Sequence, residues 1–199
     1  MIIPQSSNRL GRVDLIDGLK DLVRRLHRDG QNTAVYLVGG AALSIRYFPH
    51  RDLTDDIDAK IHPAARALEH AVDIASDRGW GTDWLNTSAE RFIPFAKDAG
   101  WDILYNDNTV SVWVASPECL LAMKLKAARP GRDDDDIALL LSLVDIRSAL
   151  AAEQLFEEFY PGEILQHRAF DILKDIFSVG LPPAPVPPPR PDLGPAERN

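Results

Sequence analysis

Two aspartates separated by one residue, Asp56 and Asp58, form the pattern in this sequence that is best suited to chemistry. If residues 56–61 form a strand, both carboxylates lie on one face, with their Cα atoms roughly 6.5 to 7 Å apart. Two such charges repel each other unless a cation neutralises them. Mg²⁺ suits this role, because proteins bind it through one or two carboxylates together with the phosphates of a substrate. The pair therefore predicts a magnesium site for a phosphorylated ligand.

A pair of glycines, Gly39 and Gly40, follows the apolar run Ala34–Val38, which reads as a buried strand, and precedes a helical pattern over residues 41–47. Glycines in such a turn let the backbone approach a phosphate, and the helix N-terminus offers N–H groups to an anion. A tight turn alone also explains the glycines, and solvated acids at a strand end also explain the aspartates. Their combination in this order favours a phosphate-binding site.

A second set of chemically interesting residues begins with a lysine in the helix that is predicted to start at Ser116-Pro117. Lys124 shares its helix face with apolar and small residues, namely Leu120, Leu121, Ala127 and Ala128. A lysine on an inward face needs an anionic partner, such as a triphosphate or an aspartate. The alternative is a lysine whose stem covers the core while its ammonium group reaches water.

Four aspartates, Asp133 to Asp136, then open another predicted helix. Acids in the first turn interact favourably with the helix dipole, and this explains Asp134 and Asp135. Asp133 prolongs the apolar stripe of the helix and Asp136 borders it, so these two are the candidates for a site.

The first motif resembles that of the minimal nucleotidyltransferases of the DNA polymerase β superfamily. Their hallmark is a hydrophobic residue, Gly-Gly or Gly-Ser, a spacer and Asp-x-Asp, and it matches Val38-Gly39-Gly40 and Asp56-Ile57-Asp58. The form Arg51-x-x-Thr54-x-Asp56-x-Asp58 looks more like the AbiEii/MenT-type toxins. The resemblance implies that Asp56 and Asp58 hold Mg²⁺ and the nucleotide triphosphate. It also implies nucleotide contacts by Gly39, Gly40, Arg51 and Thr54.

The ending Arg132-Asp133-x-x-Asp136 is similar to that of the same toxin-type proteins. It implies that Lys124, Arg132 and Asp133 bind the nucleotide, and that Lys124 and Asp136 take part in catalysis. The choice between Asp133 and Asp136 as the functional acid stays open, and the register of the match favours Asp136. Many superfamily members carry a third metal-binding acid on a later strand. Residues 109–114 contain none, and Asp102 on the preceding strand is a weak substitute.

The order of the elements predicts an α+β fold, with a nucleotidyltransferase-type mixed-sheet lobe and a helical C-terminal lobe. We expect residues 1–115 to form the catalytic lobe and 116–180 a helical lobe that completes the active site. The proline-rich residues 181–199 should be an extended or disordered tail outside the core. The other predicted elements are helices over 10–27, 63–77, 148–160 and 162–177 and a hairpin over 101–105 and 109–115, whereas 78–99 gives only strand pieces.

Composition narrows the classes of protein further. The 199 residues carry a net charge of −8, which excludes a broad basic face for duplex DNA. The single cysteine, Cys119, excludes a disulfide framework and is expected in the core. The five histidines lack the spacing of metal ligands. No apolar run is long enough to span a membrane and no signal peptide is evident, so we expect a cytoplasmic protein.

The leading hypothesis is therefore a magnesium-dependent nucleotidyltransferase, which transfers a nucleotide from an NTP to a hydroxyl and releases pyrophosphate. Resemblance to the toxin branch implies a tRNA 3′ end as acceptor and a cognate antitoxin as partner. Two alternatives remain: transfer to a small molecule such as an aminoglycoside, which the acidic charge would attract, and a non-catalytic interaction module on this fold.

The basic end of the first helix, with Arg24, Arg25 and Arg28, reads as a solvated helix end, and contact with a nucleic-acid phosphate is the alternative.

Overall fold

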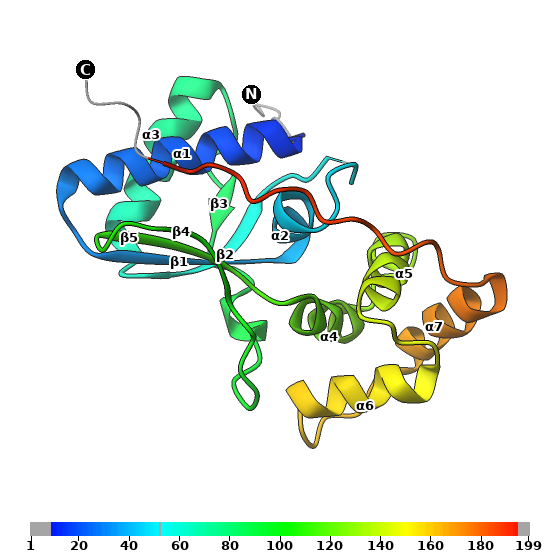
Figure 1. Cartoon of the computed structure of the whole chain (residues 1–199). Helices are drawn as coiled ribbons and strands as arrows, with labels where there is room; N and C mark the ends of the chain where they lie inside the picture. The colour runs from blue at the N-terminus through cyan, green and yellow to red at the C-terminus, as the bar shows by residue number, and fades with distance from the viewer. Residues whose placement is uncertain (1–8, 52, 195–199) are drawn as a thin grey trace, which may run out of the picture. The chain divides into compact units, whose positions relative to one another are not determined.

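The computed structural model describes residues 9–51 and 53–194, which form two compact units (Figure 1). The first unit contains, of the described residues, 9–51, 53–91, 102–114 and 187–194. The second contains residues 92–101 and 115–186. The first unit therefore carries the glycine and aspartate motifs, and the second carries Lys124 and the acids that follow it.

A mixed five-stranded sheet is the centre of the first unit. Its strands are β1 (Thr33–Val38), β2 (Ile57–His62), β3 (Leu85–Asn86), β4 (Asp102–Asn106) and β5 (Val110–Val114). They are ordered β3-β2-β1-β5-β4, with β1 antiparallel to β2 and parallel to β5. Strand β3 runs parallel to β2, and β4 forms the predicted hairpin with β5. The ends of β1, β2 and β3 that carry Val38, Asp58 and Asn86 lie next to one another as a result.

Three helices belong to this unit: α1 (Arg12–Asp29), α2 (Gly39–Arg46) and α3 (Ala65–Arg78). The apolar stripe of α1 is buried, as its spacing predicts, through Leu15, Leu19, Leu22, Val23 and Leu26. Gly30 caps the C-terminal end of α1, and its φ of 66° is a left-handed conformation that favours glycine. Helices α1 and α3 lie side by side next to the sheet (Figure 1).

One tryptophan, Trp84, connects α1 and α3 to the start of β2 and to β3. Trp84 is fully buried, and its indole Nε1 donates a hydrogen bond to the Ala71 carbonyl of α3 at 2.8 Å. Its own carbonyl accepts a bond from the Ile57 backbone N–H at 2.6 Å. On the other side the ring packs against Gly18 of α1, where an added Cβ would come within 2.7 Å of the ring. Trp84 thus fixes the start of β2 and the position of the short strand β3.

The second unit consists mainly of helices α4 (Pro117–Ala127), α5 (Asp134–Leu143), α6 (Ala149–Phe159) and α7 (His167–Val179). Ser116 caps α4 by accepting a bond from the Cys119 backbone N–H, and Pro117 occupies the first turn. Both features follow from the sequence signal for a helix start. Helix α4 packs against α5 and α6, and α7 packs against α5 and α6.

The α+β fold class is confirmed, and most of the predicted elements lie within two residues of their expected bounds. Three details differ. Helix α2 begins at Gly39 rather than at residue 41, and α7 begins at His167 rather than at 162. Between residues 79 and 100 there are only the two-residue strand β3 and the 3-10 helix η1 (Glu90–Phe92). Segments this short carry no periodicity that a sequence pattern can reveal.

The proline-rich tail has no helix or strand over residues 181–194, as expected. It was wrong, however, to place all of it outside the core, because Leu193 is only 1% exposed. Arg190 forms an ion pair with Asp102 of β4, and Arg12 of α1 donates a hydrogen bond to the Pro189 carbonyl. A single leucine among prolines gives no pattern, so its burial depends on these tertiary contacts. The expectation for residues 195–199 lies outside the described residues.

Across residues 9–51 and 53–194, no helix combines the length and the apolar character that a membrane crossing requires.

Replacement of Gly18 by alanine tests the packing of Trp84. Alanine favours a helix over glycine by about 1 kcal/mol, but its methyl group would overlap the indole ring. We expect Gly18→Ala to lower the free energy of unfolding by about 1–3 kcal/mol, as measured by urea denaturation. Val13→Ala, at an exposed site on the same helix, is the control. A Gly18→Ala protein as stable as the wild type would contradict this account.

Candidate functional site

The pairing of β1 with β2 brings the glycine turn and the aspartate motif together. Asp58 on β2 lies opposite Val38, the last residue of β1. Gly39 follows with a φ of 68°, a conformation that favours glycine. A Cβ on Gly39 would stand 3.0 Å from Oδ2 of Asp58. The carboxylate therefore rests against a backbone turn that only glycine forms without strain.

The two aspartates share one face of the chain. Ile57 and Ala59 are fully buried, whereas Asp56 and Asp58 are half-buried, and this alternation is that of a strand with one face toward the core. Asp56 immediately precedes β2, and its Oδ2 accepts a hydrogen bond from Nδ2 of Asn86 at 2.7 Å. Asn86 is in turn the register partner of Asp58 on β3. Asp58 thus lies between the glycine turn and Asn86.

A cation lies on the other side of the glycine turn. A Cβ on Gly40 would meet the guanidinium group of Arg51, with Nη2 at 3.0 Å and Cζ at 3.2 Å. The positive charge of Arg51 is thereby held against the first turn of α2, whose leading N–H groups have no partner within the helix. Backbone N–H groups and a guanidinium in one place are suited to an anion such as a phosphate.

Thr54 lies in the segment that leads into β2, two residues before Asp56. Its backbone forms a two-way bridge with Leu10, with N···O distances of 2.8 and 3.0 Å. Its hydroxyl donates to the Asp56 carbonyl at 3.4 Å. These contacts fix the segment that leads into β2, and the nucleotide contact of Thr54 stays a prediction.

The second unit contains a buried cluster of charges. Lys124 is 7% exposed, and its Nζ lies 2.6 Å from Oδ1 of Asp133 and 2.8 Å from Oδ2 of Asp136. Arg129 adds three bonds to Asp133, from its backbone N at 3.1 Å, Nε at 2.8 Å and Nη2 at 2.9 Å. The inward lysine thus has two aspartate partners, and the alternative of a lysine that reaches water does not describe it.

Asp133 is the more completely described acid of this cluster. Burial by itself raises the pKa of the Asp133 carboxyl, but the hydrogen bonds from Arg129 and the charge of Lys124 outweigh this effect. The pKa of Asp133 consequently lies well below its ordinary value. Both Asp133 oxygens are occupied by donors that close the turn between α4 and α5. Arg132 is exposed, so Arg129, which sequence reasoning did not select, is the arginine that binds Asp133.

The carboxylates of the first unit fit a magnesium ion by their chemistry. Mg²⁺ prefers oxygen donors and usually keeps several waters next to one or two carboxylates and the phosphates of a substrate. Asp56 and Asp58 offer such a donor set beside a turn suited to phosphate. Within the part of the chain that the structure describes, no cluster of three or more His, Cys, Asp or Glu side chains could hold a metal by itself. The rest of the ion's coordination shell would accordingly come from water and from the phosphates of a ligand.

Asp102 does not supply a third acid for this site. It lies on β4, three strands away from β2, which is roughly 14 Å at about 4.8 Å per strand. Its carboxylate is bound by Arg46 Nε at 2.9 Å and by Arg190. The sequence shows the acid but not the two arginines that neutralise it.

Asn86 is the site residue that sequence reasoning missed. It follows Trp84 in a stretch where no strand pattern was evident, and β3 is only two residues long. The one usable signal is the polar run Asn86-Thr87-Ser88 directly after two buried residues, which marks a strand end. Nothing in the sequence indicates that this end pairs with β2.

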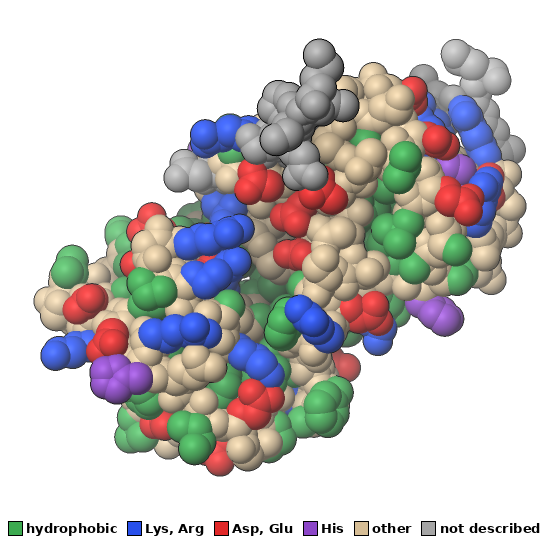
Figure 2. Space-filling view, turned by 180° about the vertical axis from the view of Figure 1, so that it is seen from behind, with side chains coloured by type: hydrophobic (Ala, Val, Ile, Leu, Met, Phe, Trp, Pro, Cys, Tyr) green, Lys and Arg blue, Asp and Glu red, His purple; other side chains and the backbone are tan. Residues whose placement is uncertain are grey.

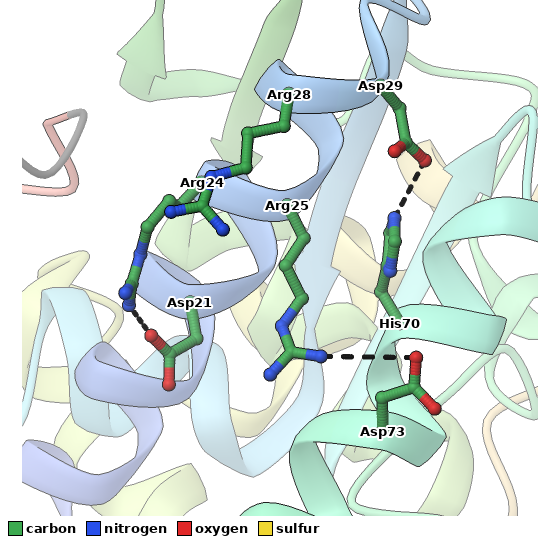
Figure 3. A pocket seen from close by; sticks show the side chains of 7 residues that line it. All are labelled: Asp21, Arg24, Arg25, Arg28, Asp29, His70 and Asp73. Atoms are coloured by element: carbon green, nitrogen blue, oxygen red, sulfur yellow. Dashed lines mark hydrogen bonds and ion pairs between the residues drawn. The ribbon is translucent and has the colours of Figure 1, made fainter. Parts of the chain in front are cut away.

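The basic end of α1 lines a separate hollow of about 400 Å³ (Figure 3). Arg24 pairs with Asp21, Arg25 pairs with Asp77 at 2.6 Å, and His70 contacts Asp29 at 2.8 Å. Acids thus compensate Arg24 and Arg25, which fits a helix end stabilised by ion pairs better than a phosphate site. On the molecular face in Figure 2, Lys and Arg side chains likewise lie among Asp and Glu side chains.

Cys119 is a core residue, as expected. Its side chain is fully buried in the first turn of α4. Burial raises the pKa of its thiol to about 12, so the reactive thiolate is scarce at neutral pH. Cysteine chemistry is therefore not part of the candidate site.

Residues 15–148 match the model of a protein family described as "Nucleotidyltransferase of unknown function (DUF6036)". The match spans about two thirds of the chain and includes both the glycine–aspartate motif and the Lys124 cluster. No curated protein and no solved structure matches the chain.

Replacement of Asp133 by asparagine tests the structural role of that acid. The variant keeps the shape but leaves Lys124 with one carboxylate, and we expect it to lower the free energy of unfolding by about 3 kcal/mol at neutral pH. Because the folded-state pKa of Asp133 is depressed, its contribution is complete above the unfolded pKa of about 4 and is lost as the pH falls further. The difference between wild type and variant should therefore shrink below about pH 4, as measured by urea unfolding across pH.

Asp135→Asn is the matched control, because Asp135 is exposed in the same first turn of α5. It should cost only about 0.5 kcal/mol through the helix dipole. A difference between Asp133→Asn and wild type that is small, or that grows toward acid, would argue against the assigned role.

Proposed function

Because the chain belongs to this family of nucleotidyltransferases, whose function is unknown, we propose that it is a magnesium-dependent transferase that moves a nucleotide from an NTP to an acceptor hydroxyl and releases pyrophosphate. The observation that carries the proposal is the contact of the Asp58 carboxylate with the left-handed turn at Gly39. This contact joins a candidate metal ligand to a candidate phosphate cradle within one pair of strands.

In this proposal Asp56 and Asp58 hold Mg²⁺, which neutralises charge on the triphosphate and on the reacting oxygens when it is bound. The chain itself supplies positioning. The N–H groups of Gly39 and Gly40 and the guanidinium of Arg51 bind phosphate oxygens from one side, and Thr54 keeps the approach to β2 in place. Fixed donors around a developing negative charge are a major source of rate enhancement in such reactions.

For Lys124 and Asp136 we propose the roles that the toxin-type sequence motif implies. Lys124 would bind a phosphate, with Arg132 as a further exposed cation for the nucleotide. Four donors already bind Asp133, namely Lys124 and three groups of Arg129, so we assign it the task of orienting Lys124. We propose Asp136 as the functional acid of the pair, because the register of the sequence motif favours it.

For the acceptor we propose a tRNA 3′ end, with the chain acting as the toxin of a toxin–antitoxin pair and a cognate antitoxin as its partner. The support is the resemblance of the residues from Arg51 to Asp58 to the toxin-type motif. A net charge of −8 suits an enzyme that contacts the end of an RNA rather than its length. Transfer to a small cationic hydroxyl compound is the competing outcome.

Asp58→Asn is the variant that tests the reaction. Wild-type protein, labelled NTPs, Mg²⁺ and total tRNA should give labelled tRNA, and Asp58→Asn should lower the rate at least about 100-fold, because it removes a metal ligand. Asp55→Asn, at an exposed acid three positions earlier, should keep the wild-type rate. Labelling is measured on gels after each incubation.

Three results would count against parts of this proposal. Label on an aminoglycoside but not on tRNA would reject the RNA acceptor and keep the reaction. Equal labelling by wild type and Asp58→Asn would reject the assigned site. No labelling of any acceptor, together with no binding of NTP or Mg²⁺ in calorimetry, would identify a non-catalytic module.

A further inference from the structure

The side-chain amide of Asn86 has a fixed orientation. Its Oδ1 accepts a hydrogen bond from the Ser88 backbone N–H at 2.9 Å. Since that N–H can only donate, the amide oxygen must face Ser88, and the NH₂ group must face the other way. Nδ2 then donates to Oδ2 of Asp56 at 2.7 Å and to the Asp83 carbonyl at 3.3 Å. All three hydrogen bonds of the Asn86 amide therefore agree with one assignment of its oxygen and nitrogen.

Strand pairing and the turn that follows β3 fix the position of Asn86. Asn86 is the register partner of Asp58 on β3, and the preceding Trp84 and Leu85 are buried. The neighbouring turn is closed by a backbone bond from Glu90 N to the Thr87 carbonyl at 3.0 Å. The amide donor is thus held from both sides while it contacts Asp56.

The type of side chain also matters at this position. An amide donates to a carboxylate without adding charge, whereas an acid here would place a third negative charge beside Asp56. Hydrogen bonds to metal-binding carboxylates orient those ligands, and their loss commonly costs about tenfold or more in metal affinity.

We propose that Asn86 is a positioning residue of the Asp56–Asp58 site, whose amide N–H holds the Asp56 carboxylate in place for a divalent cation without adding charge. The inference rests on the proposed metal-binding role of the two aspartates. It adds a residue from a third strand to the site, so that β1, β2 and β3 each contribute to it.

The hairpin of the same unit provides a matched control. Asn106, at the end of β4, accepts a bond from the Asn108 backbone N–H at 3.2 Å, the same kind of turn that Asn86 makes with Ser88. Asn106→Ala removes that turn contact without touching Asp56. It therefore measures what the loss of such a turn contact costs elsewhere in the same sheet, and an effect found only in Asn86→Ala supports the role of the contact with Asp56.

The test is direct binding of Mn²⁺, a spectroscopic substitute for Mg²⁺, to the full-length chain, with free Mn²⁺ counted by electron paramagnetic resonance. We expect Asn86→Ala to weaken Mn²⁺ binding about tenfold, and Asn106→Ala to bind like the wild type. Asn86→Asp is a second variant. Its melting temperature without metal should fall, because two carboxylates meet, and the rise on adding Mn²⁺ should exceed that of the wild type.

Equal Mn²⁺ affinity of Asn86→Ala and wild type, or an equal loss in Asn106→Ala, would overturn the inference. A rise in melting temperature of Asn86→Asp no larger than that of the wild type would do the same. Asp58→Asn separates the two proposals: if it binds Mn²⁺ like the wild type, the metal site is elsewhere and the inference fails. If wild-type protein binds Mn²⁺ through Asp58 but transfers no nucleotide, only the proposed reaction is rejected.

Discussion

The register between β1 and β2 is the constraint on which the candidate site depends. Val38 pairs with Asp58, and the buried side chains of Ile57, Ala59 and Ile61 specify this alignment because they must face the core. A slip of one residue would turn both carboxylates into apolar surroundings and bring Ile57 to the glycine turn. The cost of burying two charges excludes that alternative. The apolar residues between the acids therefore position the site as much as the acids themselves do.

The aspartates of the two units have different neighbours. In the second unit Asp133 is saturated by Lys124 and Arg129, so that a buried ion cluster closes the turn between α4 and α5. Such clusters add little net stability, yet removing one partner is costly. In the first unit, Asn86 donates to Asp56 through a neutral amide, and Asp58 lies against the glycine turn at Gly39. The position of Asp58 beside a glycine turn is what relates the first pair of acids to a phosphorylated ligand.

A structural feature can be predicted from this sequence when the pattern that encodes it spans enough residues. The stripe of α1 and the motif around Asp58 span enough residues for their period and spacing to show. The place of Asn86 does not follow from such a pattern, because β3 has two residues and is held by Trp84 through contacts with α1 and α3. Leu193 and Asp102 are similar cases: their surroundings are decided by partners far away along the chain.

The proposed site has a further physical consequence that follows from its small number of ligands. Two carboxylates and a neutral amide leave most of the coordination shell of a Mg²⁺ ion to water or to phosphate oxygens. An NTP that supplies those oxygens binds better when the ion is present, and by thermodynamic linkage the ion binds better when the NTP is present. A third carboxylate would weaken this coupling, because the ion would then depend less on the nucleotide. Asn86 in place of an acid therefore favours an enzyme that takes up metal and nucleotide together.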